Sequence, residues 1–380
     1  MQVYLDNAAT TTMAEEVIQR MTNVMREDFG NPSSTHFYGR KTKGFIETAR
    51  REIAATIHAL PSEIIFTSGG TEADNMALHC AVDHLNVTRI ITTAIEHHAV
   101  LHTAEFLRDT KGIKLEFLEL DAKGNVNLIQ LEELLAKKSG DTLVSLMHAN
   151  NEIGTLLDLH RVGELCSSYG AYFHSDTVQT MGHYPLNVQE LKVDFLTCAA
   201  HKLHGPKGVG FLYVNKRIKP IPLIHGGSQE RGYRGGTENL YGIIGLAEAM
   251  KIAYQEIELH QKHIQGIKRY MISLLKENIP GVRFNGEIEE DKSLYTVLNV
   301  CLPPSEKSGI LLFTLDLKGV ACSGGSACSS GSNKGSHVLA GINADTTRPN
   351  VRFSFSRYTT KAEIDYAVAV LSEVYKTQMA

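Results

Sequence analysis

Two residues that could act together on a cofactor lie 26 positions apart in the middle of the chain. Asp176 ends the apolar run 171–176, and Lys202 follows in the segment 199–208. A lysine amine can form a Schiff base with an aldehyde. A carboxylate can keep a pyridine nitrogen protonated, so that the ring accepts electrons. Pyridoxal phosphate needs both groups, and the pair therefore predicts a site for this cofactor.

A glycine-rich turn upstream could hold the phosphate of such a cofactor. The run 66–75 follows a predicted strand and opens a predicted helix, with Gly70 and Thr71 at the junction. Free N–H groups at a helix start, together with the Thr71 hydroxyl, form an anion site. The alternative is an ordinary helix start, which Glu72 and Asp74 in the first turn would favour. Beside the Asp–Lys pair we favour the phosphate interpretation.

Further polar side chains follow apolar runs and are expected at strand ends. His97 could stack on an aromatic cofactor and move protons, or it could be a surface histidine; for His98 we favour the surface position. In the segment 148–152 an asparagine amide could donate to the phenolate oxygen of the cofactor. Gln179, three residues after Asp176, could make the same contact.

Two arginine-containing segments could bind anions. The glycine-rich loop 225–237 carries two arginines and Thr237, which suit another oxyanion contact, although a flexible connection is the alternative. Near the C-terminus Arg352 and Arg357 flank the segment 353–356. Strand alternation places Arg352 on one face, where a guanidinium is a usual partner of a substrate carboxylate. A structural salt bridge is the alternative for Arg352.

Cys328 decides the type of reaction. It lies in the Gly/Ser-rich stretch 323–336, where a thiol has no packing role, whereas inert cysteines usually lie within apolar runs. Cys322 stays ambiguous, because it follows a predicted strand. A metal site of Cys322, Cys328 and His337 matches no common spacing, so we expect no metal. The cysteines that fit the inert description are Cys80, Cys166, Cys198 and Cys301.

Composition excludes several classes of protein. The 38 basic and 42 acidic residues give a formal net charge of −4, which does not suggest a nucleic-acid-binding surface. No apolar stretch approaches the roughly 18 residues of a membrane span, and the N-terminus lacks the features of a signal peptide. We therefore expect a cytoplasmic protein with free thiols, no membrane contact and no nucleic-acid partner.

The chain up to about residue 215 alternates short apolar runs with helical patterns. Helical spacing of apolar residues appears at 128–136 and 159–168, between the apolar runs. This alternation predicts an α/β layer with a largely parallel sheet, in which ligands bind at the C-terminal ends of strands. The runs expected as strands are 64–66, 89–91, 115–118, 143–146, 172–173, 195–196 and 209–214.

The last third of the chain predicts a second, smaller unit. One long helical pattern at 241–278 bridges into it. Residues 280–380 then suggest strand, strand, loop, strand and helix, which fits an α+β domain.

In this order the segments resemble the cysteine desulfurases, which belong to the class V aminotransferase group of fold type I pyridoxal phosphate enzymes. The match runs from 4–11, Tyr-Leu-Asp-Asn-Ala-Ala-Thr-Thr, to 352–354, with further motifs at 30–34 and 150–154. The Gly-Ser-Ala-Cys-Ser-Ser form around Cys328 is similar to the group that serves nitrogenase and general iron–sulfur assembly.

The resemblance implies a two-domain architecture. A large domain, 13–255, would hold a mainly parallel seven-stranded sheet and the cofactor. A smaller α+β domain would combine 1–12 with 256–380 and carry the catalytic loop 323–336.

The resemblance also implies roles for the candidate residues. Lys202 would hold the cofactor as a Schiff base, Asp176 would pair with the ring nitrogen, and His97 would stack on the ring and transfer protons. Cys328 would be the nucleophile. The binding residues would be Asn151 and Gln179 on the phenolate side, Gly70, Thr71 and His201 at the phosphate, Thr237 reaching it from the second subunit of a homodimer, and Arg352 with Asn31 at the substrate carboxylate.

The implied activity is removal of sulfur from L-cysteine, which gives L-alanine and a persulfide on Cys328. The sulfur would serve iron–sulfur cluster assembly and other sulfur transfer, so an acceptor or scaffold protein is an expected partner. The sequence departs from the family at Ala199, three residues before Lys202, where relatives carry a serine that contacts the phosphate. We therefore expect somewhat lower cofactor affinity.

Three alternatives share part of this evidence. Another class V aminotransferase would keep Lys202 and Asp176 but would not need Cys328. A selenocysteine lyase would use the same site for the larger chalcogen. A non-enzymatic partner in an assembly complex predicts loss of Lys202 or Asp176, and both are present.

Overall fold

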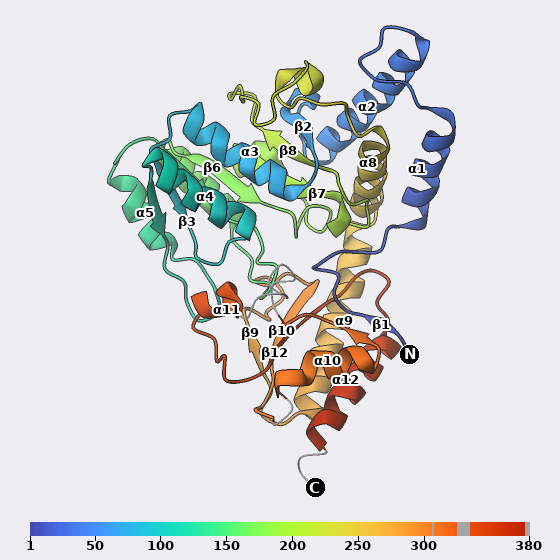
Figure 1. Ribbon diagram of the computed structural model, residues 1–380. Helices are drawn as coiled ribbons and strands as arrows, with labels where there is room; N and C mark the ends of the chain where they lie inside the picture. The colour runs from blue at the N-terminus through green and yellow to red at the C-terminus, as the bar shows by residue number, and fades with distance from the viewer. Residues whose placement is uncertain (306–307, 325–334, 377–380) are drawn as a thin grey trace.

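The computed structural model describes residues 1–305, 308–324 and 335–376. A seven-stranded sheet with the order β2-β8-β7-β6-β5-β3-β4 forms the centre of the larger part (Figure 1). Only β8 runs antiparallel to its neighbours β2 and β7; the other pairs are parallel. The α/β class with a mainly parallel sheet is confirmed. The strands are β2 (Ile64–Thr67), β3 (Arg89–Thr92), β4 (Lys114–Phe117), β5 (Thr142–Ser145), β6 (Tyr172–Asp176), β7 (Phe195–Ala199) and β8 (Gly210–Val214).

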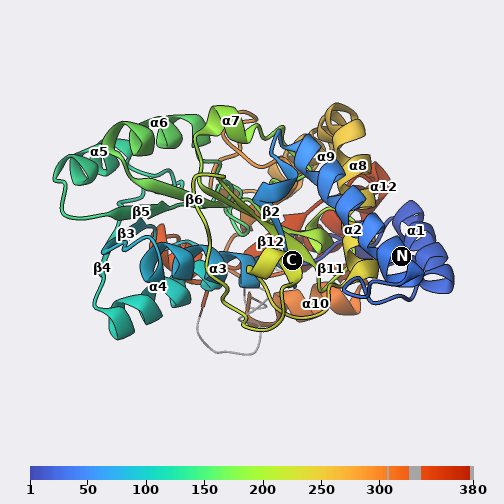
Figure 2. The same ribbon diagram turned by 90° about the horizontal axis from the view of Figure 1, so that it is seen from above.

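Helices cover both faces of this sheet, which explains why most strands are continuous apolar runs. Viewed from above, α3 and α4 lie on one side of the sheet and α5, α6 and α7 on the other (Figure 2). Phe173, Phe195 and Phe211 are fully buried. The helices of this part are α1 (Glu15–Glu27), α2 (Phe37–Thr56), α3 (Gly70–Asp83), α4 (His98–Lys111), α5 (Leu128–Ala136), α6 (Leu159–Tyr169), α7 (Val188–Leu191) and α8 (Leu240–Gln255).

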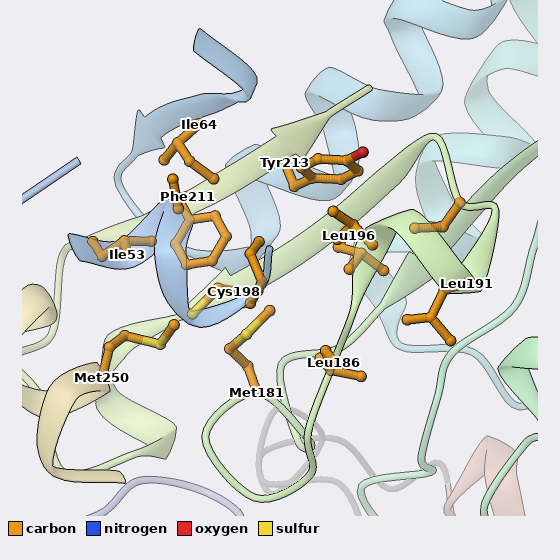
Figure 3. Packing of buried hydrophobic residues seen from close by; sticks show 14 of the residues in the cluster. Ile53, Ile64, Met181, Leu186, Leu191, Leu196, Cys198, Phe211, Tyr213 and Met250 are labelled. Carbon is orange, nitrogen blue, oxygen red and sulfur yellow. The ribbon is translucent and has the colours of Figure 1, made fainter. Parts of the chain in front are cut away.

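The core beneath β7 joins sheet and helices. Cys198 on β7 packs among Met181, Phe211 on β8 and Met250 on α8 (Figure 3). Cys80, Cys166, Cys198 and Cys301 are all buried free thiols, as the sequence predicted.

Local sequence sets the ends of the helices that flank the sheet. The Asp158 side chain caps α6 by accepting from the Arg161 N–H at 3.0 Å. Gly112 and Gly170 end α4 and α6 with φ of 69° and 71°, a left-handed conformation that glycine adopts without strain.

The long helical pattern predicted as one bridge is two helices. α8 ends at Gln255, Glu256 leaves helical geometry with φ −119° and ψ 20°, and α9 (Ile257–Asn278) continues into the smaller part. The sequence has no proline or glycine at this break, and apolar residues continue on both sides of it. The expectation of a single helix was therefore wrong.

The smaller part contains an antiparallel sheet with the order β12-β10-β9 and a parallel pair of β1 with β11. The predicted strands, including the one before Cys322, and the last helix are present, but α10 and α11 were missed. α10 reads Leu-Leu-Phe-Thr-Leu-Asp-Leu, which is too uniformly apolar to show a helical period. The elements are β1 (Val3–Tyr4), β9 (Arg283–Asn285), β10 (Val297–Cys301), α10 (Leu311–Leu317), β11 (Val320–Ala321), α11 (His337–Gly341), β12 (Asn350–Ser354) and α12 (Lys361–Lys376).

The N-terminal segment connects the two parts. β1 pairs with β11, and the chain then crosses to the large sheet, where the Thr11 N–H donates to the His201 carbonyl at 2.9 Å. This crossing places residues 6–11 over the C-terminal ends of the strands. Within the described residues, none of the helices is both long and apolar enough to cross a membrane.

Candidate active site

A cavity of about 240 Å³ lies at the C-terminal ends of β6 and β7 and extends to β12 of the smaller sheet. This is the place where ligands bind in open α/β sheets. Nine of the residues predicted to bind the cofactor or substrate line it, and they come from separate segments of the chain. They are Gly70, Thr71, His97, Asn151, Asp176, Gln179, His201, Lys202 and Arg352.

Lys202 ends a short 3-10 turn, Ala200–Lys202, directly after β7. Its Nζ donates to the carbonyl oxygens of Ala8 at 2.5 Å and Ala9 at 2.8 Å. The N-terminal segment therefore holds the lysine amine at the cavity by main-chain groups.

Asp176 is the last residue of β6, and its Oδ1 accepts from the Val178 N–H at 2.8 Å. Burial, and after it the charge of Asp74, raise the pKa of Asp176 to about 6, while His97 opposes the shift. A cation placed against this carboxylate would favour its ionised form. Asp176 is thus suited to a protonated ring nitrogen.

His97 is the N-cap of α4, and its Nδ1 accepts from the Ala99 N–H at 3.2 Å. The proton of the neutral imidazole therefore lies on Nε2. Burial lowers the pKa of His97, and Lys202 lowers it too, while Asp176 opposes them. His97 consequently stays uncharged near neutral pH and can both accept and return a proton.

One end of the cavity is suited to an anion. Gly70 and Thr71 begin α3, so main-chain N–H groups and the positive end of the helix dipole face this end. A Cβ on Gly70 would lie 2.8 Å from the Val178 Cγ2, so glycine lets the helix start this close to the strand end. His201 also lines this end, and its Nδ1 lies 3.2 Å from the Thr10 hydroxyl.

Arg352 on β12 lines the other side and is 1% exposed. Its guanidinium donates to Asp6 Oδ1 at 2.8 Å and to the Asn151 carbonyl at 3.0 Å. Its Nε is buried without a hydrogen-bond partner among the described residues. The salt bridge considered as an alternative for Arg352 is therefore present, with Asp6, and the Arg352 Nε remains as a donor for a further group.

The two neighbouring asparagines of the segment 148–152 have different roles. The Asn150 side chain is buried and donates to the Ile95 carbonyl at 2.8 Å, while its oxygen accepts from the Glu152 N–H. Asn151 lines the cavity instead. Gln179 lines it too, with Nε2 donating to the Ala8 carbonyl at 3.1 Å.

Three predicted residues are not part of this cavity. Thr237 lines a separate cavity of about 200 Å³, together with Ser68 and Arg234. Asn31 is exposed in the α1–α2 connection, where its Oδ1 accepts from the Ser33 N–H. Cys328 lies outside the described residues.

The described residues that flank the segment of Cys328 bond to Arg352 of the cavity or to residues next in sequence to its lining residues. Ser323 exchanges main-chain hydrogen bonds with Arg352. On the other flank the Ser336 hydroxyl donates to Glu152 Oε2 at 2.5 Å, and His337 Nε2 donates to the Glu96 carbonyl at 2.9 Å. The chain therefore leaves and rejoins the described structure beside the site.

Asp74 and the carbonyl groups of Ala8 and Ala9 were missed as parts of the site. Asp74 was interpreted as a helix-initiating residue, but it lines the cavity and is 1% exposed. Its position among Ala73, Met76 and Ala77, which are all buried, was the available signal. Atoms of Asp74, His97 and Asp176 all lie within 4.8 Å of one another, so these are also the candidate metal ligands within the described part of the chain.

His98 also differs from its prediction. It is half-buried rather than a satisfied surface residue, and its Nδ1 has no hydrogen-bond partner in the described part of the chain. Its ring packs against His102 and His337, with centroids 4.7 Å and 4.4 Å away.

The residues of the cavity fit pyridoxal phosphate. The donor set supplies an amine for the aldehyde, a buried carboxylate for the ring nitrogen and a helix start for the phosphate. Because Gly70 has no side chain, the start of α3 lies close to Val178, which a larger residue would prevent.

Comparison with known proteins agrees with this geometry. Residues 3–367 match the family described as aminotransferase class-V. The chain is 44% identical to the cysteine desulfurase IscS of Dictyoglomus turgidum, across 98% of this chain and 94% of that protein.

Solved structures show the same relationship. A NifS-like protein has a TM-score of 0.91 and 36% identity, and the match covers 99% of this chain and 100% of that one. SspA in complex with cysteine has a TM-score of 0.82 and 31% identity, with 94% and 100% covered. Enzymes of this family depend on pyridoxal phosphate. The chain belongs to the class V aminotransferase family and, within it, to the cysteine desulfurases.

Proposed function

We propose that the protein removes sulfur from L-cysteine, releases L-alanine and carries the sulfur as a persulfide on Cys328. The observation that supports it most strongly is the convergence of Lys202, Asp176 and Arg352 on one cavity. These three provide the amine, the ring partner and the carboxylate partner that the reaction needs.

Pyridoxal phosphate supplies an electron sink that stabilises negative charge on the α-carbon. Lys202 would hold the aldehyde of the cofactor, and its free amine would remove the α-proton of the substrate. Asp176 would keep the ring nitrogen protonated. His97 moves protons at Nε2, and Arg352 holds the substrate carboxylate, with its uncommitted Nε as a donor.

Cys328 then acts as the nucleophile. Its thiolate attacks the substrate sulfur, an S–S bond forms and the C–S bond breaks. The electron pair of that bond stays on the three-carbon fragment, which takes up protons and leaves as L-alanine. A thiol reductant releases sulfide from the persulfide, or an acceptor protein takes the sulfur.

The remaining binding roles belong to Asn151 and Gln179 at the phenolate side and to His201 at the phosphate. We propose a cytoplasmic homodimer, in which Thr237 reaches the phosphate of the second subunit. Support comes from the position of Thr237 outside the cavity of its own chain and from exposed aromatic side chains close in sequence to Asn31. These are Phe29, Phe37 and Tyr38, at 71%, 64% and 51% exposed. An iron–sulfur scaffold or another sulfur acceptor is the proposed partner.

The deciding experiment follows alanine and sulfide from L-cysteine in the presence of a thiol reductant and without any 2-oxo acid. Equimolar alanine and sulfide from a yellow protein are expected. A transaminase would need the 2-oxo acid and release no sulfide, which would contradict the proposal. Parallel assays with L-selenocysteine test the alternative of a selenocysteine lyase, which would act on L-selenocysteine but not on L-cysteine.

Arg352→Ala is expected to lower kcat/KM for L-cysteine by roughly 10²- to 10³-fold, mainly through KM, because it removes the carboxylate partner and leaves Asp6 unpaired. Arg352→Lys keeps the charge but loses the planar fork, so an intermediate loss is expected. Steady-state kinetics measure both. Arg357→Ala, five positions along, is the control and should stay within twofold. An unchanged KM in Arg352→Ala would show that Arg352 does not bind the substrate carboxylate.

Ala199→Ser is expected to tighten cofactor binding. The Ala199 Cβ lies 3.7 Å from the position of a Cβ on Gly70, so a hydroxyl there would face the anion end of the cavity. One added hydrogen bond is worth about 1 kcal/mol, which is roughly a fivefold change in Kd. Absorption titration of the apo-protein with pyridoxal phosphate measures it. Ala199→Val, which offers no donor, should not tighten binding; equal gains in both variants would refute the hydroxyl contact.

A further inference from the structure

Asp6 is a charged residue beside the site to which the proposed chemistry gives no task. It lies two residues after β1, and its Oδ1 accepts from the Arg352 guanidinium at 2.8 Å. Within the described residues it is the only carboxylate that forms an ion pair with Arg352. The nearby Glu152 carboxylate accepts from the Ser336 hydroxyl instead. The proposed partner of the substrate carboxylate is thus already paired with a carboxylate of the chain itself.

The two charges of this pair differ in burial. The Arg352 side chain is 1% exposed, whereas 21% of the Asp6 side chain is exposed. A guanidinium this dry is costly without a counter-charge, so Asp6 stabilises it in the substrate-free protein. Arg352 lines the cavity and Asp6 does not. A carboxylate in the cavity would therefore meet Arg352 without taking the place of Asp6.

Main-chain contacts fix Asp6 next to β12. Asp6 forms a bridge with Ser354, which stands two residues after Arg352 on that strand. The Ser354 N–H donates to the Leu5 carbonyl at 2.8 Å, and the Ser354 carbonyl accepts from Asn7 Nδ2 at 2.9 Å. Because its neighbours on both sides are held in this way, Asp6 would stay beside Arg352 when a substrate binds.

Arg352 does not depend on Asp6 alone for its orientation. Its guanidinium also donates to the Asn151 carbonyl at 3.0 Å. Its main chain exchanges hydrogen bonds with Ser323, and the residue pairs with Asn299 on β10. Loss of the Asp6 charge should therefore change the charge balance at Arg352 more than the position of the guanidinium.

We propose that Asp6 sets the affinity of the site for the α-carboxylate of substrate and product. Two carboxylates that share one guanidinium repel each other, so Asp6 weakens the hold of Arg352 on L-cysteine and on L-alanine alike. A weaker hold on both does not lower turnover when substrate is abundant, and it lets the product leave. Asp6 is a positioning residue that acts through Arg352, and the inference rests on the proposed role of Arg352.

Asp6→Asn separates the charge from the contact. The amide keeps an oxygen acceptor for Arg352 but removes the negative charge. Because Asp6 is partly in water, the affinity for L-alanine is expected to rise roughly tenfold rather than more. KM for L-cysteine should fall by a similar factor, while kcat should not rise, because substrate and product are bound alike. Asp6→Glu keeps the charge and should stay within about threefold of the wild type.

Isothermal titration calorimetry of the holoenzyme with L-alanine measures the affinity and does not depend on sulfide release. Asp194→Asn is the matched control. Asp194 is 1% exposed and pairs with Arg217 at 2.6 Å, next to the N-terminal end of β7, which is the end opposite the cavity. This variant also loses a buried carboxylate from an arginine pair, and its affinity for L-alanine should match that of the wild type.

Thermal unfolding gives a second measurement that also serves a variant of low stability. Asp6→Asn leaves the buried guanidinium without a counter-charge, so its Tm should fall. L-alanine brings a carboxylate back to Arg352. At one fixed excess it should therefore raise the Tm of Asp6→Asn more than it raises the Tm of the wild type.

Three outcomes decide the inference. An affinity for L-alanine in Asp6→Asn that equals or falls below the wild-type value would overturn it, because Asp6 would then only orient Arg352. An unchanged affinity in Arg352→Ala would refute the substrate role of Arg352 and the inference with it. A wild type that binds L-alanine but releases no sulfide from L-cysteine would refute the proposed activity, and the affinities would still decide the role of Asp6.

Discussion

Replacing Cys328 by alanine is expected to abolish sulfide release while leaving the yellow colour of the enzyme unchanged. The sulfur leaves the substrate only when a thiolate accepts it, so removal of this nucleophile should cost at least about 10³-fold in turnover. The cofactor contacts come from other residues, so cofactor affinity should stay within twofold. Sulfide assay and visible absorption measure the two quantities on the same sample.

Cys322→Ala is the matched control for this variant. Cys322 follows β11, and burial raises the pKa of its thiol to about 12, which leaves it protonated and a poor nucleophile. Cys322→Ala should therefore retain more than half of the activity. Mass spectrometry of alkylated peptides should find one added sulfur atom on the Cys328 peptide of the wild type. Full activity in Cys328→Ala would mean that another group is the nucleophile, which would contradict the proposed persulfide on Cys328.

The fold was largely predictable because its strands are buried on both faces. The run around Phe211 is almost wholly apolar, and the run that contains Phe173 begins with apolar residues before it ends at Asp176. The break at Glu256 was not predictable, since both flanking helices keep their apolar period. α10 was missed for the opposite reason, because a uniformly apolar segment has no period to detect.

The site was predictable where a polar residue ends an apolar run. Asp176 ends β6 and His97 begins the helix that follows β3, and parallel strands bring their ends to one edge of the sheet. Main-chain groups carry no such signal: the Ala8 and Ala9 carbonyls reach Lys202 across more than 190 residues. Asp74 was ambiguous, because an acidic residue early in a helix is ordinarily explained by the helix dipole.

Thr237 and Asn31 show a different limit of sequence reasoning. Their roles come from the family resemblance, and within one chain neither lines the cavity. A contact made across a subunit interface has no spacing in the sequence that could reveal it. Their contribution to the site stays a prediction that depends on the proposed homodimer.

The second large effect is expected for Lys202→Ala, which removes both the covalent hold on the cofactor and the base that takes the α-proton. General base catalysis alone contributes about 10²- to 10⁴-fold, so turnover should fall by at least about 10³-fold. The phosphate site at α3 and the carboxylate of Asp176 remain, so the cofactor should still bind, with the absorption of its unlinked aldehyde. Visible spectra before and after gel filtration distinguish linked from unlinked cofactor.

Chemical rescue separates the two roles of Lys202. A small primary amine added to Lys202→Ala can take the proton but cannot tether the cofactor, so partial recovery of alanine formation is expected with rapid loss of cofactor on gel filtration. Lys207→Ala, five positions along and exposed, is the control and should match the wild type. At the Ala8 and Ala9 carbonyls, water can replace the Lys202 Nζ as hydrogen-bond donor. If Lys202→Ala kept more than a tenth of the activity, the base would have to be another group of the cavity, and His97 would be the first to test.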